Sequence, residues 1–277
     1  MIYKNDLGNR IIYSYVLGRF SKKTASYFQY FPIANWQNEF KVAKKFGFDG
    51  VEWIVSDLSN PIFNDIFRKI INKNLKKNKV KVCSIFLDFI MRKPLYKLNK
   101  KDLIWIVAQI KKLKKDLKFK RLTIPIEETC RYKNQIQRKK TLNALNFLFV
   151  NLKSNLKFCI ETDLNINEIE KVLNDKRFKD LGLLIDLGNI RASNRRIQDY
   201  LDKFSDRIFS IHIKFRDKNW GKSTHIPKDF FELGHVKHNF HRLKKINDIT
   251  FQTFRSDNKF LNDMKRSIKN FNEIIKK

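Results

Sequence analysis

Short runs of apolar, β-branched or aromatic residues recur along the chain, and longer segments with a helical pattern separate them. This alternation predicts strands that lie side by side in a parallel sheet, with helices as crossovers. The spacing between runs, about 30 to 40 residues, suits one strand, one helix and two loops. The predicted strands are Ile11–Leu17, Gly50–Val55, Val80–Leu87, Arg121–Ile126, Lys157–Thr162, Leu181–Leu187, Ile208–Lys214 and Ile249–Arg255.

The segments between these strands carry apolar residues at helical spacing, and Asn35 and Asn134 are candidate N-caps. The predicted helices are Trp36–Phe46, Ile62–Asn74, Lys101–Leu117, Gln135–Leu152, Ile166–Leu173, Arg195–Phe204 and Lys259–Lys276, with a short turn over Phe240–Lys245.

Eight strands with their crossovers predict an α/β fold, a single (β/α)₈ TIM barrel that forms one domain over residues 1–277. An open doubly wound sheet would show the same alternation. However, no Gly-rich phosphate loop follows the first strand, and the chain has only 8 Gly. No linker rich in Pro, Gly or Ser divides the chain, so one barrel is the favoured interpretation.

The composition fits a folded domain with a strongly basic surface. The 42% hydrophobic content can supply a large core, and 59 Lys and Arg against 28 Asp and Glu give a net charge of +31. Such a charge raises the possibility of nucleic acid or an anionic surface as a partner. The basic residues are spread along the whole chain, however, so we interpret them as solvated helix faces and do not expect a nucleic-acid partner.

The cysteines and the N-terminus favour a cytoplasmic location. Cys83, Cys130 and Cys159 have no CxxC spacing, which predicts reduced thiols rather than a disulfide framework or a zinc ribbon. The N-terminus lacks the apolar stretch of a signal peptide, and no run of about 18 apolar residues predicts a membrane span.

The last four predicted strands each place a polar residue near the carboxyl end, where TIM barrels build their active sites: Glu161, Asp186, His212 and Gln252. An isolated charge there is costly to bury unless it is paired or bound to a cation. Each residue alone could be a helix cap or an ion-pair partner. Together, two carboxylates, an imidazole and an amide oxygen predict a divalent metal site that suits Mn²⁺ or Mg²⁺ better than Zn²⁺.

This order of residues resembles the xylose isomerase-like TIM barrels, particularly the sugar-phosphate isomerase/epimerase family. The resemblance extends over nearly the whole chain, in collinear order. It includes Leu17–Arg19, Phe31–Pro32, Gly47–Ile54, Asn60–Pro61, Val82–Ile85, Ile124–Pro125, Glu161–Leu164 and Asp186–Asn189.

The resemblance implies an isomerase or epimerase in which a metal binds two adjacent oxygens of a sugar and stabilises an enediolate. Epimerases of this family place one Glu on each face of the substrate, from strands five and eight. Here strand eight offers Gln252, which cannot exchange protons at neutral pH. The predicted catalytic residues are therefore Glu161, Glu52 and Glu128, with Asp88 as a less favoured fourth.

The resemblance also implies a small sugar or sugar phosphate as the partner, with a homo-oligomer as one possible assembly. Four cations at the predicted strand ends, Arg19, Lys214, Arg216 and Arg255, could hold a substrate phosphate. The alternative interpretation is that these four residues are ordinary solvated surface cations without a role in binding.

Departures from the family pattern leave two alternatives open. Phe215 stands where the family has an acid, and the turn Leu233–Phe240 lacks a Gly and an Asp of the family pattern. The first alternative is a catalytically inactive or binding barrel that keeps the fold, with or without the metal. The second is a nucleic-acid enzyme like the apurinic endonucleases, which the charge would suit. Those enzymes need a trinuclear zinc cluster, and the first four predicted strands contain no His.

Overall fold

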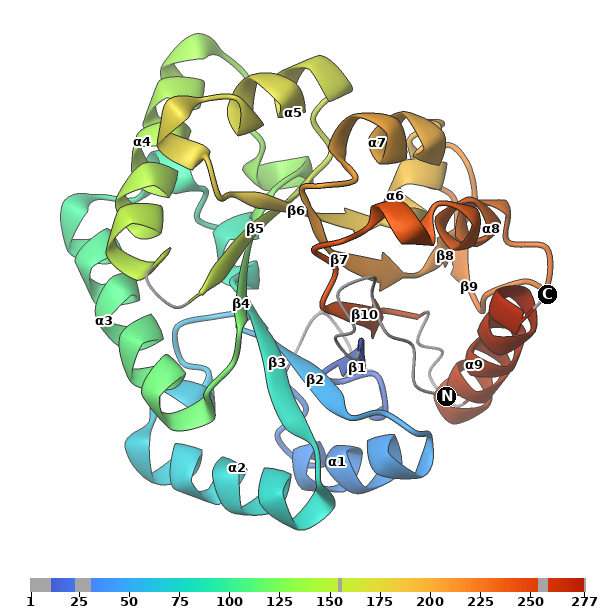
Figure 1. Cartoon of the computed structure of the whole chain (residues 1–277). Coiled ribbons are helices and arrows are strands. Elements are labelled where there is room, and N and C mark those ends of the chain that lie inside the picture. The colour runs from blue at the N-terminus through green and yellow to red at the C-terminus, as the bar shows by residue number, and fades with distance from the viewer. Residues whose placement is uncertain (1–10, 23–30, 154–155, 254–258, 277) are drawn as a thin grey trace.

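The computed structural model describes residues 11–22, 31–153, 156–253 and 259–276, and these form a closed parallel barrel with helices around it (Figure 1). The order around the barrel is β1-β10-β7-β6-β5-β4-β3-β2. The predicted (β/α)₈ barrel is thus confirmed. The barrel strands are β1 (Ile12–Val16), β2 (Gly50–Ile54), β3 (Lys81–Phe86), β4 (Arg121–Ile126), β5 (Lys157–Thr162), β6 (Gly182–Asp186), β7 (Ile208–Ile213) and β10 (Asp248–Phe251).

Helices surround the barrel, and most match the predicted segments. The helix predicted over Ile62–Asn74 is shifted: Pro61–Phe63 forms a 3₁₀ turn, and α2 runs over Asp65–Asn78. The Asn64 side chain caps α2 by accepting from the Phe67 N–H at 2.9 Å. The helices are α1 (Trp36–Lys45), α2 (Asp65–Asn78), α3 (Lys100–Leu117), α4 (Gln135–Leu152), α5 (Ile166–Leu173), α6 (Leu187–Ala192), α7 (Ile197–Phe204), α8 (Phe231–His238) and α9 (Phe260–Lys276).

Four short elements after β6 and β7 were not predicted. Helix α6 follows β6 without a loop. Helix α8 covers most of Leu233–Phe240, the segment that the family pattern predicted as a turn. The strands β8 (Phe215–Arg216) and β9 (Ser223–Thr224) form a small antiparallel hairpin beyond β7. These elements are short, and α8 lacks a clear apolar stripe, so periodicity gives no signal for them.

A layer of polar side chains lies inside the barrel, next to a small apolar cluster of Val16, Ile54 and Phe86 that is separate from the main apolar core. TIM barrels usually fill this interior with branched apolar side chains. Here Arg121 of β4 reaches Asp248 of β10, on a strand well separated from β4 around the ring. The polar side chains in contact there are Ser14, Glu52, Ser84, Arg121, Thr123, Ser210, Asp248 and Thr250.

Within the described ranges, no helix has both the length and the apolar character needed to cross a bilayer.

Candidate functional site

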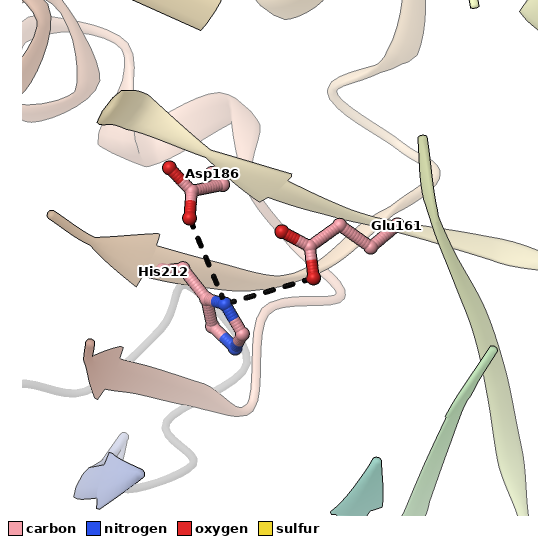
Figure 2. A group of neighbouring side chains, drawn as sticks. All are labelled: Glu161, Asp186 and His212. Carbon is pink, nitrogen blue, oxygen red and sulfur yellow. Dashed lines mark ion pairs between the residues drawn. The ribbon is translucent and has the colours of Figure 1, made fainter. Parts of the chain in front are cut away.

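Three of the predicted ligands converge near the carboxyl ends of adjacent strands. Asp186 of β6 and His212 of β7 are direct register partners, and Glu161 of β5 pairs with Leu184, two residues before Asp186. Because alternate residues of a strand point to the same face, all three side chains point into the barrel. Their candidate ligand atoms lie within 4.8 Å of one another, and Figure 2 shows both carboxylates directed at the imidazole.

The chemistry of this group fits a divalent cation. His212 Nδ1 lies 3.9 Å from Glu161 Oε2 and 4.0 Å from Asp186 Oδ2. All three side chains are buried, and Nδ1 has no hydrogen-bond partner among the described residues. A buried polar atom without a partner is costly, and a cation held between these atoms would satisfy it. The second Asp186 oxygen, Oδ1, accepts from the Asn189 N–H at 2.8 Å, so capping of α6 fixes the carboxylate.

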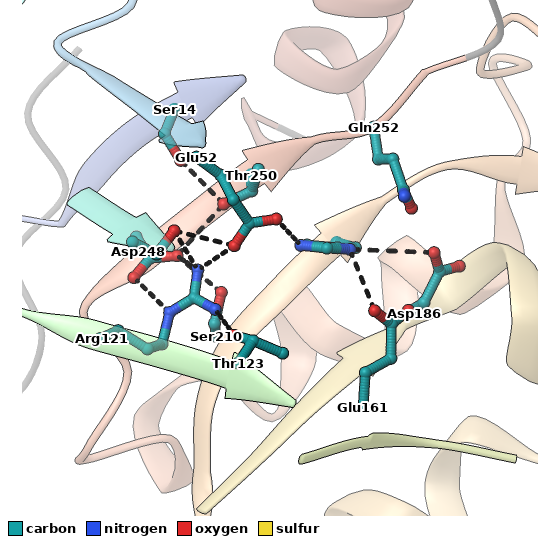
Figure 3. Close-up of polar contacts among 12 residues, drawn as sticks. Ser14, Glu52, Arg121, Thr123, Glu161, Asp186, Ser210, Asp248, Thr250 and Gln252 are labelled. Carbon is teal, nitrogen blue, oxygen red and sulfur yellow. Dashed lines mark hydrogen bonds and ion pairs between the residues drawn. The ribbon is translucent and has the colours of Figure 1, made fainter. Parts of the chain in front are cut away.

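Lys214 also enters the site, next to the fourth predicted ligand. Its Nζ lies 2.8 Å from Asp186 Oδ2 and donates to Gln252 Oε1 at 3.4 Å. Gly188 leaves the room for this side chain, because a Cβ there would lie 2.9 Å from the Lys214 carbonyl oxygen and 3.1 Å from its side chain. Gln252 follows β10 and is buried (Figure 3). The site therefore includes an ammonium group that competes with any cation for the same oxygens.

Glu52, a predicted base, lies on the other side of His212, deeper in the barrel. Its Oε1 is 2.8 Å from His212 Nε2, in a bent contact that does not have normal hydrogen-bond geometry. The side chain is fully buried. Burial alone would raise the pKa of Glu52, but the neighbouring His212 and Arg121, together with a hydrogen bond from Ser84, lower it to about 2. Glu52 is thus held by His212, Ser84 and Arg121 in the interior of the barrel.

Glu127 is the site residue that the sequence interpretation missed. It follows β4, is buried, and accepts from Asn189 Nδ2 at 3.3 Å. Burial first, and then the Asp186 and Glu128 charges, raise the pKa of Glu127 to about 8, although Lys214 lowers it. Its only sequence signal was its place just after a strand, and that signal applies equally to Glu128.

Glu161 is a second carboxyl of the site with a raised pKa. Burial, followed by the Glu127 and Asp186 charges, raises the pKa of Glu161 well above its ordinary value. Three carboxyl groups so close together cannot all ionise cheaply without a cation. The site thus attracts positive charge.

The remaining predicted residues lie around the mouth. Glu128 is 46% exposed, and its Oε1 lies 3.9 Å from Arg216 Nη1. Arg19 is buried. Burial raises the pKa of the nearby Asp88 carboxyl to about 7, although the Arg92 and Arg19 charges lower it. Arg255, the fourth predicted substrate-binding residue, lies outside the described residues.

Phe215 packs away from the three ligands. Its ring contacts Phe230 edge-on at 5.4 Å, and the Arg191 guanidinium lies 4.9 Å from the ring centroid. The aromatic residue that replaces the acid of the family pattern therefore joins the β8–β9 hairpin to α6 and the start of α8.

A small cavity of about 20 Å³ adjoins the ligands, and Glu127, Glu161, Asp186 and Arg195 are among its lining residues. A larger cavity of about 990 Å³, with several lysines in its lining, opens at the amino ends of the strands. It lies at the opposite end from the face on which TIM barrels carry their active sites. Among the described residues, Glu161, Asp186 and His212 are the only group of three or more acidic, His or Cys side chains with ligand spacing.

Comparisons with solved structures identify the fold. The IOLI protein with a bound zinc atom superposes with a TM-score of 0.72 at 11% identity, over 96% of this chain and 98% of that one. A sugar phosphate isomerase/epimerase from Parabacteroides distasonis gives a TM-score of 0.66 at 12% identity, over 95% of each chain. The chain has the xylose isomerase-like barrel fold. No protein-family model and no curated protein sequence matches it.

This xylose isomerase-like barrel also resembles a protein of different chemistry. The probable 3-DHS dehydratase AsbF from Bacillus anthracis has a TM-score of 0.66 at 14% identity, over 94% of this chain and 98% of that one. Identities this low support the fold alone, so the reaction has to be argued from the site.

Proposed function

We propose that the chain is a divalent-metal-dependent isomerase or epimerase of a sugar or sugar phosphate, acting through an enediolate at the mouth of the barrel. The convergence of Glu161, Asp186 and His212 is the observation that carries the proposal. The zinc-bound and isomerase/epimerase neighbours support it at the level of the fold.

In this proposal Glu161, Asp186 and His212 hold the metal, and Gln252 is the fourth ligand. When bound, the cation would supply Lewis-acid polarisation of two adjacent sugar oxygens. Two carboxylates and an amide oxygen beside one imidazole make a mostly oxygen ligand set, which favours Mn²⁺ or Mg²⁺ over Zn²⁺.

The proton-transfer step falls to carboxyl groups at the mouth of the barrel. Glu161 lines the small cavity beside the other ligands, so it lies where a substrate proton would be exchanged. Glu128 is the exposed alternative. Gln252 cannot exchange protons, which favours removal and return of the proton by one carboxyl group over the two-carboxylate scheme. We assign Glu52 a positioning role, because it is enclosed beneath His212.

For the substrate, Arg19, Lys214 and Arg216 remain the proposed contacts of a phosphate group. Arg216 also donates through Nε to the Gly221 carbonyl oxygen at 3.1 Å, which holds its side chain along the hairpin. A sugar phosphate should therefore bind more tightly than the corresponding free sugar. A cytoplasmic location and a homo-oligomeric assembly stay predictions.

The contact of Lys214 with Asp186 favours a second candidate function. An ammonium group 2.8 Å from Oδ2 already neutralises one ligand of the site. A barrel that binds a small anionic sugar without transforming it would use the same contact, with no metal required.

Metal analysis of protein purified without chelators tests the first proposal. We expect close to one Mn²⁺, Mg²⁺ or Zn²⁺ per chain, and loss of that metal in Glu161→Ala and His212→Ala. Lys203→Met, which breaks a surface ion pair with Glu170, is the matched control and should retain the metal. Absence of metal, both as purified and after reconstitution, would contradict the metal-dependent function.

Solvent deuterium incorporation then separates an enzyme from a binding barrel. Across a panel of ketoses, aldoses and their phosphates in D₂O, an enediolate reaction places deuterium at C2 or C3 of one substrate. Binding of a sugar phosphate without any exchange would support the second candidate instead.

A further inference from the structure

The polar layer inside the barrel reaches His212 on its Nε2 side, whereas the candidate metal ligands lie on its Nδ1 side. Glu52 Oε2 accepts from the Ser84 hydroxyl at 2.8 Å and from Arg121 Nη2 at 2.9 Å. Arg121 is held in turn by Asp248, through Nη2 to Oδ1 at 2.7 Å and Nε to Oδ2 at 3.2 Å. Figure 3 shows this group on one side of the site, with Glu161 and Asp186 on the other.

The group is anchored from several strands, so it has little freedom to rearrange. Asp248 Oδ1 also accepts from the Ser210 hydroxyl at 2.6 Å and from Thr250 at 3.1 Å. The Thr250 hydroxyl lies 2.7 Å from that of Ser14 on β1. Arg121, Glu52 and Asp248 are each at most 3% exposed in their side chains. A buried charged network with its polar atoms paired is rigid, since breaking any one contact leaves a desolvated charge.

The two oxygens of Glu52 therefore have different roles. Ser84 and Arg121 satisfy Oε2, whereas Oε1 lies 2.8 Å from His212 Nε2. An oxygen of the Arg121-paired Glu52 carboxyl at this distance repels a nitrogen lone pair and attracts a proton, so the imidazole proton is favoured on Nε2. With the proton there, Nδ1 keeps its lone pair, and Nδ1 is the atom that faces Glu161 Oε2 and Asp186 Oδ2.

We infer that Glu52, held by Arg121, Asp248 and Ser84, is a positioning residue that selects the Nε2–H tautomer of His212 and thereby keeps Nδ1 free to bind a metal. The inference deepens the proposed function and rests on it for the identity of the ligand site. Carboxylates that orient a ligating histidine usually change metal affinity by 10-fold to 100-fold when they are removed.

Glu52→Gln tests the inference, because it keeps the size of the side chain and removes its charge. The amide can turn its NH₂ toward His212, which would favour the proton on Nδ1. Glu39→Gln is the matched control, since Glu39 is also a fully buried carboxylate, but it contacts Ser21 and the Gly18 N–H instead of the site. Each variant thus loses one buried negative charge.

The first readout is the protonation of His212 in metal-free protein, from ¹⁵N NMR shifts of the imidazole at about pH 9. Resonances are assigned with a His212→Gln variant. We expect a proton on Nε2 and none on Nδ1 in the wild type and in Glu39→Gln, and a proton on Nδ1 in at least part of Glu52→Gln. A proton on Nδ1 in the wild type, or an unchanged tautomer in Glu52→Gln, would overturn the inference.

The second readout is the affinity for Mn²⁺ and Zn²⁺, measured by calorimetric titration of each metal alone. We expect Glu52→Gln to bind at least 10-fold more weakly than the wild type and Glu39→Gln to bind within about 2-fold of it. Equal affinities in Glu52→Gln and the wild type would overturn the inference. If the wild type binds neither metal, the proposed function fails, whereas the tautomer measurement still decides whether Glu52 positions His212.

Discussion

At the scale of single residues, the site contains more negative groups than cations to pair with them. Glu127, Glu161 and Asp186 line a small cavity together with Arg195, and Lys214 Nζ lies 2.8 Å from Asp186 Oδ2. The protonation of the carboxyls and the position of Lys214 therefore depend on whether a metal is bound.

Replacement of Lys214 by Met is expected to strengthen metal binding by about tenfold, or ~1.4 kcal/mol. The reason is that a metal no longer has to displace an ammonium group from Asp186 Oδ2, which lies 2.8 Å from Lys214 Nζ. Calorimetric titration with Mn²⁺ measures the change, and Lys203→Met again serves as the control for loss of one charge. Weaker or unaltered binding in Lys214→Met would show that the ammonium and the metal do not compete.

Replacement of Glu127 by Gln is expected to make the stability of the metal-free protein less sensitive to pH. The pKa of Glu127 is raised to about 8 in the folded chain, above a value of about 4.3 in the unfolded chain. The unfolded chain therefore loses this proton first, and the folded state loses stability as the pH rises from about 4.3 to about 8.

Thermal denaturation of both proteins in chelator, between pH 5 and pH 8, measures this effect. The stability advantage of Glu127→Gln over the wild type should be small at pH 5 and reach a few kcal/mol at pH 8. Glu128→Gln removes a charge from the next, half-exposed residue, and its effect should be much smaller. An advantage that does not grow with pH would rule out the raised pKa.

At the scale of elements, the mouth of the barrel is completed by α6, α8 and the β8–β9 hairpin. Asp186 both ends β6 and caps α6, so the strand, the helix and the candidate ligand are one local unit. Phe215 attaches the hairpin to this unit through Arg191 and Phe230.

Replacement of Phe215 by Ala is expected to loosen the hairpin without removing the metal ligands. Loss of a half-buried ring and its aromatic contact should cost about 1 to 2 kcal/mol locally. Hydrogen exchange should speed up over residues 215–224, while metal affinity stays within about 2-fold of the wild type. Phe63→Ala, which removes a similar edge-on contact with Trp105 at 5.1 Å, should leave exchange in the hairpin unchanged. Unchanged hairpin exchange in Phe215→Ala would refute the attachment.

At the scale of the whole molecule, charged and hydroxyl side chains link strands across the barrel. Arg121 connects β4 to Glu52 on β2 and to Asp248, the first residue of β10. Since its side chain is 2% exposed, its loss would leave two carboxylates desolvated and unpaired.

Arg121→Met is expected to lower the free energy of unfolding by about 3 to 5 kcal/mol. Arg68→Met is the control, because Arg68 is also buried but its partners Asp65 and Asp116 are 71% and 37% exposed. Those carboxylates stay hydrated when Arg68 is lost, so the cost should be smaller. Chemical denaturation measures the free energy of unfolding of both variants. An equal decrease in the two would contradict the larger contribution that we expect from the ion pairs of Arg121.

The sequence by itself determined the barrel and the candidates Glu161, Asp186 and His212. Strand and helix periodicity are local properties, and residues at corresponding ends of parallel strands must meet at one face of a closed barrel. Helices α6 and α8 escaped prediction because each is short and neither shows a long periodic pattern.

Only the tertiary structure decided which carboxyl groups are buried beside the candidate ligands, which are exposed, and which belong to the network inside the barrel. Glu127 and Glu128 are neighbours just after β4, yet one is buried and the other is 46% exposed. Glu52 lies 69 residues from Arg121 and 160 residues from His212 in the chain, and Asp248 lies 127 residues from Arg121. Contacts over such separations follow from closure of the barrel, because only closure places side chains from distant strands in the same interior.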